Sequence, residues 1–261
     1  MPKFTFYKYQ GAGNDFVVFD SRDSNILDHL NEQSIAYLCD RRFGVGGDGL
    51  MVLKHHPDYD FEMIYYNSDG RPSSMCGNGG RCLVAFAKRQ GVIDSACSFI
   101  AIDGPHDAKI VDGVIELQMK DVDQVEYLGE DYILDTGSPH FIRRVSGLES
   151  LDIIPEAHKI RYNDRFTKDG INVNFCHFND IGLDIRTYER GVENETLACG
   201  TGATAAAIAY ADAKDMIGAN VIPVNAVGGD LYVRLTKSAA GYTDVWLCGP
   251  GDFVFEGEII F

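Results

Sequence analysis

MCGNGGRCLVAFAKRQG, residues 75–91, and ACGTGATAAAIAYADAK, residues 198–214, follow the same plan. In each stretch a cysteine precedes a glycine-containing turn that runs into a helical pattern. Glycine lets the backbone turn sharply, and an apolar stripe over residues 83–87 runs on until Gly91 can cap the first helix. The second pattern is small and apolar nearly all round, which is typical of a helix enclosed by sheet. We predict two central helices, each beginning directly after its cysteine.

The segments between these helices are mostly short runs rich in β-branched and aromatic residues, separated by turn residues. One further helix is expected near residues 32–42. A chain with many such strands and few helices is predicted to be α+β, with largely antiparallel sheets. The runs include FTFYKY, FVVFD, GLMVLK, FEMIYY, GVIELQM, YILDTG, FIRRV, LDIRTY, LYVRL, DVWLC and EGEIIF.

The chain also repeats itself. FEMIYYN (61–67) and LDIRTYE (183–189) share an alternating run, and a Cys-Gly-x-Gly follows ten or eleven residues after its last tyrosine. Self-similarity of this kind predicts two similar halves. Their boundary is expected in the acidic stretch KDVDQVEYLGED, residues 120–131.

Composition excludes several classes of protein. The formal net charge of −16 opposes binding to nucleic acid, which needs clustered Lys and Arg. The seven cysteines lack CxxC spacing, so neither a zinc site nor a secreted disulfide framework is indicated. No apolar run is long enough to span a membrane, and the start lacks a signal-peptide core. We expect a cytoplasmic protein with no nucleic-acid or membrane partner.

Two cysteines at helix N-termini suggest a specific chemistry. The positive end of a helix dipole favours thiolate over thiol, and the N–H groups there can hold a carboxylate. If the two halves face each other, one thiolate can remove a proton from a carbon while the other thiol protonates its opposite face. That reaction is a racemisation or epimerisation, and it requires neither an organic cofactor nor a metal.

The ordered motifs GAGNDF, YNSDG, MCGNGGRC, TGSPHF, INVNF and YERGVENETLACGTGA resemble those of the diaminopimelate epimerase family over essentially the whole chain. The resemblance implies pyridoxal-independent interconversion of LL- and meso-2,6-diaminopimelate, in lysine and peptidoglycan precursor biosynthesis. It implies two pseudo-symmetric domains, each a curved, mostly antiparallel sheet (an open barrel) around a central helix, with the active site in the cleft between them. The expected domains are 1–124 with 252–261, and 125–251. A homodimer is also implied.

The resemblance carries site residues onto this chain. Cys76 and Cys199 match the two acid/base thiols, with His140 and Glu189 as further catalytic residues. The positions that match substrate-binding residues are Asn14, Asn67, Gly77, Asn78, Asn172, Glu189, Arg190, Gly200 and Thr201. An acceptor such as Glu189 and a forked donor such as Arg190 suit the ammonium and carboxylate at the distal end of the substrate.

Two positions depart from the family pattern. Ser138 stands where many members have the asparagine of Asn-Pro-His, so a hydroxyl with a shorter reach replaces an amide. Gly49 stands where some members place a glutamine that contacts substrate. Neither departure removes the thiols or the Glu-Arg pair. We therefore expect the two departures to affect the affinity for substrate more than the reaction itself.

Three alternatives stay open at this point. A related two-cysteine enzyme such as a proline racemase usually has Cys-Gly-His, where this chain has Cys76-Gly77-Asn78. A nucleotide-binding module would use GAGNDF or GVGGDG, although neither is a complete phosphate-binding motif. A cysteine hydrolase would need a histidine paired with a thiolate, for which His140 is a candidate.

Overall fold

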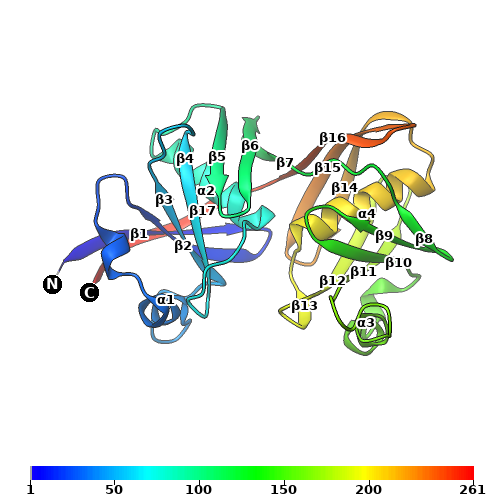
Figure 1. Ribbon diagram of the computed structural model, residues 1–261, viewed down its shortest axis with the longest axis horizontal. Helices are drawn as coiled ribbons and strands as arrows, with labels where there is room; N and C mark the ends of the chain where they lie inside the picture. Colours follow the sequence, from blue (N-terminus) through cyan, green and yellow to red (C-terminus); the bar gives the residue numbers. More distant parts are fainter. Residues whose placement is uncertain (1) are drawn as a thin grey trace. The chain divides into compact units, whose positions relative to one another are not determined.

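The computed structural model describes residues 2–261. They divide into two compact units, one that combines the chain up to Leu117 with Gly249–Phe261 and one that holds Gln118–Cys248. The domain boundaries expected from the sequence, after residues 124 and 251, lie a few residues from these limits. Each unit has its own set of paired strands and its own long helix (Figure 1).

The first unit is a mixed sheet in the strand order β17-β1-β2-β3-β4-β5-β6-β7. β2 pairs with β3 in parallel, as does β4 with β5, and the other neighbouring pairs are antiparallel. The C-terminal strand therefore completes the N-terminal sheet. The strands are β1 (Lys3–Gly11), β2 (Asn14–Asp20), β3 (Gly49–Lys54), β4 (Phe61–Asn67), β5 (Ala96–Ala101), β6 (Gly104–Val111), β7 (Val114–Gln118) and β17 (Asp252–Ile260).

Helix α2 (Gly77–Arg89) is the centre of this unit. It contacts β1, β2, β3 and β17, and Leu83, Val84 and Phe86 are completely buried. Gly91 has φ +68°, and its N–H bonds to the carbonyl of Lys88 at 3.0 Å, so it ends the helix as predicted. The shorter helix α1 (Glu32–Cys39) begins at a capping box between Asn31 and Ser34.

The second unit repeats this plan in the order β8-β9-β10-β11-β12-β14-β15-β16, and β13 pairs on β12. β10 pairs with β11 in parallel, as does β12 with β14. The strands are β8 (Glu126–Leu128), β9 (Asp131–Asp135), β10 (Pro139–Arg144), β11 (Asn172–Phe178), β12 (Leu183–Glu189), β13 (Asn194–Thr196), β14 (Gly218–Ala226), β15 (Gly229–Ser238) and β16 (Gly241–Gly249).

Helix α4 (Gly200–Ala213) is the counterpart of α2. It contacts β9, β10, β11, β12, β14 and β15, so the sheet must curve around it. Its alanines up to Ala211 are buried on every side, because only small side chains let so many strands approach one helix.

The two units share one order of pairings. From the first pair to the last, both run antiparallel, antiparallel, parallel, antiparallel, parallel, antiparallel, antiparallel. The long helix of the first unit follows β4, the fifth strand of that order; that of the second unit follows the fifth strand β12 and the short β13, and each helix begins after a cysteine. The predicted α+β class and the two pseudo-symmetric halves are confirmed.

Some elements were missed by the sequence prediction. Helix α3 (Ile153–Arg161) buries Ile153, Ala157 and Ile160 at helical spacing, and Pro155 lies in its first turn, where proline is tolerated. Strand β14 contains Pro223, which usually argues against an interior strand. Strands β5 and β6 also went unnoticed. Within residues 2–261, no helix is long and apolar enough to cross a membrane.

Candidate active site

Cys76 is the N-cap residue of α2, with its backbone in the extended region. Its Sγ accepts the N–H of Gly79 at 3.2 Å, so the sulfur lies over the first turn of the helix. A Cβ at Gly79 would be 3.1 Å from that sulfur, which explains why glycine stands there. The predicted position of this thiol at a helix N-terminus is confirmed.

Asn14 and Asn78 meet in the first unit. Asn78 Nδ2 lies 3.4 Å from Asn14 Oδ1, and Asn14 Nδ2 donates to Asp48 at 2.6 Å. Arg81, which the sequence analysis overlooked, is completely buried and donates to Asn78 Oδ1 at 2.9 Å and to the carbonyl of Gly77 at 3.2 Å. Its signal in the sequence was its position one helical turn after Gly77. Arg81 thus fixes the turn that carries Cys76.

Asn67 ends β4 directly opposite Gly49 on β3, and its side chain is exposed. A Cβ at Gly49 would lie 2.5 Å from the ring of Tyr65 and 2.7 Å from the carbonyl of Tyr66. The ring of Tyr65 therefore occupies the space that a longer side chain would need. This packing explains why the chain has glycine at this position.

Cys199 is the N-cap residue of α4, the equivalent position in the second unit. Its Sγ lies 3.5 Å from the hydroxyl of Thr201. Gly200 and Thr201 are the first two residues of the helix, as Gly77 and Asn78 are in α2. The prediction that both cysteines begin buried helices is confirmed.

His140 on β10 is completely buried beside this turn. Its Nε2 is 2.9 Å from Thr201 Oγ1, and its Nδ1 is 3.0 Å from Asn174 Nδ2. Burial lowers the pKa of His140 from 6.5 to about 3; the charge of Asp135 opposes this shift and that of Arg190 adds to it, so the imidazole is neutral.

Asn172 lies opposite His140 in the parallel register of β10 and β11. Its Nδ2 donates to Ser138 Oγ at 2.9 Å and to the carbonyl of Pro139 at 3.2 Å, and its Oδ1 accepts the N–H of Arg190 at 2.8 Å. The Ser138 hydroxyl therefore holds Asn172 in place. Asn172 in turn fixes the turn that carries Arg190.

Glu189 and Arg190 follow each other at the end of β12. Burial raises the pKa of Glu189, and the hydroxyl of Thr196 donates to its Oε2 at 3.1 Å. Arg190 Nη1 donates to the carbonyl of Asp169 at 2.9 Å. Its stem passes over Gly170, where a Cβ would lie 2.5 Å from Arg190 Cδ. Sequence reasoning missed Gly170, because this contact depends on the tertiary fold.

Most other cysteines behave as small apolar residues. Desolvation raises the pKa of Cys39 and of Cys97 to about 12, and it raises those of Cys82 and Cys176 as well. Cys248 is also completely buried. Among residues 2–261, no three His, Cys, Asp or Glu side chains are grouped so that they could hold a metal ion.

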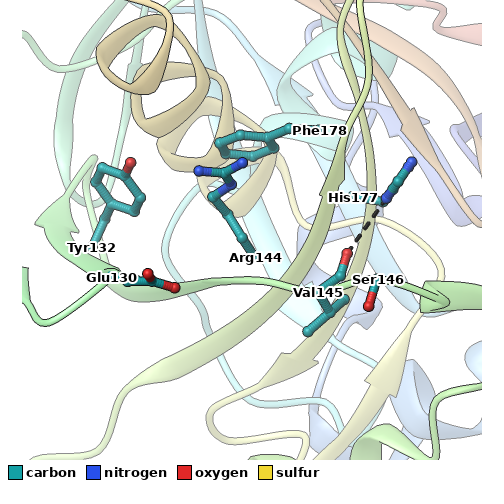
Figure 2. A pocket seen from close by; sticks show the side chains of 7 residues that line it. All are labelled: Glu130, Tyr132, Arg144, Val145, Ser146, His177 and Phe178. Carbon is teal, nitrogen blue, oxygen red and sulfur yellow. Dashed lines mark hydrogen bonds between the residues drawn. The ribbon is translucent and has the colours of Figure 1, made fainter.

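A separate pocket lies in the second unit, at the ends of β9, β10 and β11 (Figure 2). None of the predicted site residues lines it. The guanidinium of Arg144 lies over the ring of Phe178 at 5.0 Å. His177 lies apart from this pair, and its Nδ1 faces the carbonyl of Val145. The polar groups that line this pocket do not converge on one point. The lining residues are Glu130, Tyr132, Arg144, Val145, Ser146, His177 and Phe178.

The glycine motifs weighed as nucleotide sites serve other purposes. GAGNDF contains the tight turn between β1 and β2, where Ala12 and Gly13 both have positive φ. GVGGDG (44–49) leads into β3. Neither motif opens a helix, so neither has the structure of a phosphate-binding loop.

Comparison with solved structures shows which class of fold this chain has. The fold is that of a Bacillus anthracis phenazine biosynthesis protein, with TM-score 0.77 and 15% identity over all of both chains. A probable proline racemase from Agrobacterium radiobacter shares it at TM-score 0.65 and 14% identity, over 98% of this chain and 93% of that one. The chain thus shares the fold of these two proteins.

The sequence comparisons are more specific. The family model for diaminopimelate epimerase matches residues 6–131 and again residues 132–245. A diaminopimelate epimerase from Flavobacterium psychrophilum is 49% identical over 97% of this chain and 99% of its own length. The chain belongs to the diaminopimelate epimerase family.

Proposed function

We propose that this chain interconverts LL- and meso-2,6-diaminopimelate, with Cys76 and Cys199 as its two acid/base groups. The observation that carries the proposal is the equivalence of the two cysteines. Each is the N-cap residue of the buried helix in its own unit, and the two units share one order of strand pairings. A duplicated helix terminus with a thiol is what a two-base proton transfer needs.

The proton inventory of the reaction is simple. One thiolate takes the proton from Cα, so that an S–H bond forms as the C–H bond breaks. The other thiol then gives its proton to the opposite face of the same carbon, which inverts the configuration. In the reverse direction the two sulfurs exchange roles. No other group has to gain or lose a proton.

Stabilisation of the carbanionic transition state must supply most of the catalysis, because a Cα–H is far less acidic than a thiol. The first N–H groups of an α-helix have no intrahelical partner. We assign those of Gly77 and Asn78, together with those of Gly200 and Thr201, to the carboxylate at the reacting carbon. The positive ends of both helix dipoles then favour the developing negative charge.

The distal end of the substrate carries an ammonium and a carboxylate. We assign the ammonium to Glu189 and the carboxylate to Arg190, with Asn14, Asn67 and Asn172 as further binding amides. The hydrogen bonds to Asn172 and Asp169 support this assignment, because they hold the Arg190 turn before substrate arrives. We assign His140 a role at Cys199, through Thr201.

Turnover of LL-diaminopimelate beside that of L-proline tests the proposed function. We expect the first to be epimerised and the second to remain unchanged, because proline has no distal charges for Glu189 and Arg190. Turnover of proline alone would overturn the proposal. Dialysed protein should keep its activity without added pyridoxal phosphate.

We further propose a cytoplasmic homodimer. The edge strand β17 supports the association, because it exposes Phe253, Val254 and Phe255 on a nine-residue strand. Sedimentation equilibrium should give twice the mass of the chain. A Val254→Lys variant should shift the equilibrium toward monomer, and an unaltered mass for that variant would remove β17 from the interface.

A further inference from the structure

Asn174 has a fixed orientation that determines where the hydrogens lie around Cys199. It is completely buried on β11. Its amide nitrogen donates to the carbonyl of Phe141 at 3.1 Å, and its Oδ1 accepts the hydroxyl of Thr187 at 2.9 Å. A main-chain carbonyl can only accept, so the atom that faces it must be the amide nitrogen.

The second hydrogen of that nitrogen points at the ring of His140. The distance from Asn174 Nδ2 to His140 Nδ1 is 3.0 Å. Since Nδ1 faces a donor, it must accept. A neutral imidazole that accepts at Nδ1 carries its hydrogen on Nε2. Burial keeps this ring neutral, with Asp135 and Arg190 as the charged groups that act on it.

The next step leads to Thr201. His140 Nε2 lies 2.9 Å from Thr201 Oγ1, so the ring donates and the hydroxyl oxygen accepts. Asn172 Nδ2 is farther from Nε2, at 3.4 Å, and its shorter bonds go to Ser138 and Pro139. The hydroxyl hydrogen of Thr201 is then directed at Cys199, whose Sγ is 3.5 Å away.

The helix is shaped to let these groups approach. At Gly202, in the first turn of α4, a Cβ would lie 2.6 Å from Asn174 Oδ1 and 3.3 Å from His140 Cε1. Any larger residue would push Asn174 or His140 away. The hydrogen bonds therefore run in one direction from β11, through β10, to the N-cap of α4. Hydrogen bonds in the opposite direction would need a hydrogen on His140 Nδ1. That hydrogen would meet the amide hydrogen that Asn174 already directs at Nδ1.

We propose that Asn174 is a positioning residue, which acts through His140 and Thr201 to direct a hydroxyl hydrogen at Cys199 Sγ and so favours the thiolate form of this sulfur, which accepts the proton in one direction of the reaction. The inference rests on the proposed function for the role of Cys199. When Sγ takes the proton from Cα, an S–H bond forms, and the Thr201 hydrogen stays on Oγ1. His140 orients the hydroxyl and neither gains nor loses a proton.

Nitrogen-15 NMR of the histidine rings tests the direction of these bonds. We expect His140 in the wild type to carry its hydrogen on Nε2 at neutral pH. An Nδ1–H tautomer or an imidazolium would overturn the proposal. In Asn174→Leu the Nδ1 donor is gone, so a mixture of both tautomers is expected, whereas retention of the pure Nε2–H form would show that Asn174 does not set it.

The reactivity of Cys199 tests the consequence. In a Cys76→Ala background, the pH profile of alkylation by iodoacetamide should move upward by about one pH unit in Thr201→Val, since a hydrogen bond to a charged group is lost. Thr201→Ser should restore the original profile. Thr204→Val is the matched control, because Thr204 is a buried threonine one turn along α4 that donates to the carbonyl of Gly200.

The outcomes separate this inference from the proposed function. Identical profiles for Thr201→Val and Thr204→Val would refute the inference, whether or not the enzyme epimerises diaminopimelate. Conversely, the tautomer and the alkylation profile need no substrate. They would stand even if diaminopimelate were not turned over.

Discussion

Gly170→Ala should weaken substrate binding through Arg190. Gly170 lies on the connection between α3 and β11 with φ +75°, and a Cβ there would be 2.5 Å from Arg190 Cδ and 3.0 Å from its Cγ. Because Arg190 is tied to the carbonyl of Asp169 and through its N–H to Asn172, the stem can yield only if the guanidinium moves.

The size of the effect follows from two terms. A non-glycine residue in the left-handed region costs about 1–2 kcal/mol of folding free energy. Loss of charge-assisted hydrogen bonds from Arg190 to a carboxylate would remove about 1.5–3 kcal/mol of binding. That loss corresponds to a roughly 10-fold to 100-fold increase in KM, with a smaller change in kcat, because the distal contact is the same in ground and transition states.

Gly147→Ala is the matched control for the backbone term. Gly147 has φ +77°, and its added Cβ would meet only Ser150 Oγ at 3.5 Å. Both variants should lose similar stability in urea denaturation, and steady-state kinetics should show a raised KM in Gly170→Ala alone. Equal KM values in the two variants would refute the role of Gly170 in holding Arg190.

Three further predictions concern buried charge. The pKa of His140 is lowered from 6.5 to about 3, so below pH 6.5 the unfolded chain binds an extra proton and the free energy of unfolding falls as the pH falls. His140→Gln should reduce this fall by up to about 1.4 kcal/mol per pH unit. An unchanged dependence of the unfolding free energy on pH in this variant would contradict the prediction. Burial raises the pKa of Glu189 above 4.5, so the folded state holds an extra proton and stability is lost as the pH rises past 4.5. Glu189→Gln should therefore be more stable than the wild type at pH 7 but not at pH 4. Lower stability of the variant at pH 7 would contradict this prediction. Arg81→Met should lower the free energy of unfolding by about 3–5 kcal/mol, because it leaves buried acceptors unsatisfied. Arg89 is exposed, so the control variant Arg89→Met should lower it by less than about 1 kcal/mol. Similar urea midpoints for the two variants would mean that Arg81 does not hold the turn.

The parts of the fold that sequence could predict are those encoded locally. A glycine turn, an apolar stripe and Gly91 define α2 within one stretch of chain, and the same signals define α4. The repeat of these signals was enough to predict two similar halves. Strand β14 was missed because it contains Pro223, and α3 was missed because Pro155 interrupts its helical pattern.

The supporting side chains of the site could not be predicted in this way. Asn174 lies within INVNF, yet its role depends on the parallel register of β10 and β11, in which Phe141 lies opposite Val173. In the sequence Arg81 resembles an ordinary surface charge, and its burial becomes visible only in the fold, where strands enclose its helix. Such residues act through neighbours that are distant in sequence, so only the fold reveals them.

Deuterium incorporation from heavy water tests the two-thiol account most directly. A thiol carries a single proton, so the sulfur that removes the Cα proton cannot deliver solvent deuterium to the opposite face in the same turnover. Early in the reaction of LL-diaminopimelate, the two-thiol mechanism predicts deuterium in the meso product and none in the remaining substrate. It also predicts that Cys76→Ala and Cys199→Ala each fail to form product. Deuterium in both pools at early times, or substantial epimerisation by either variant, would contradict it.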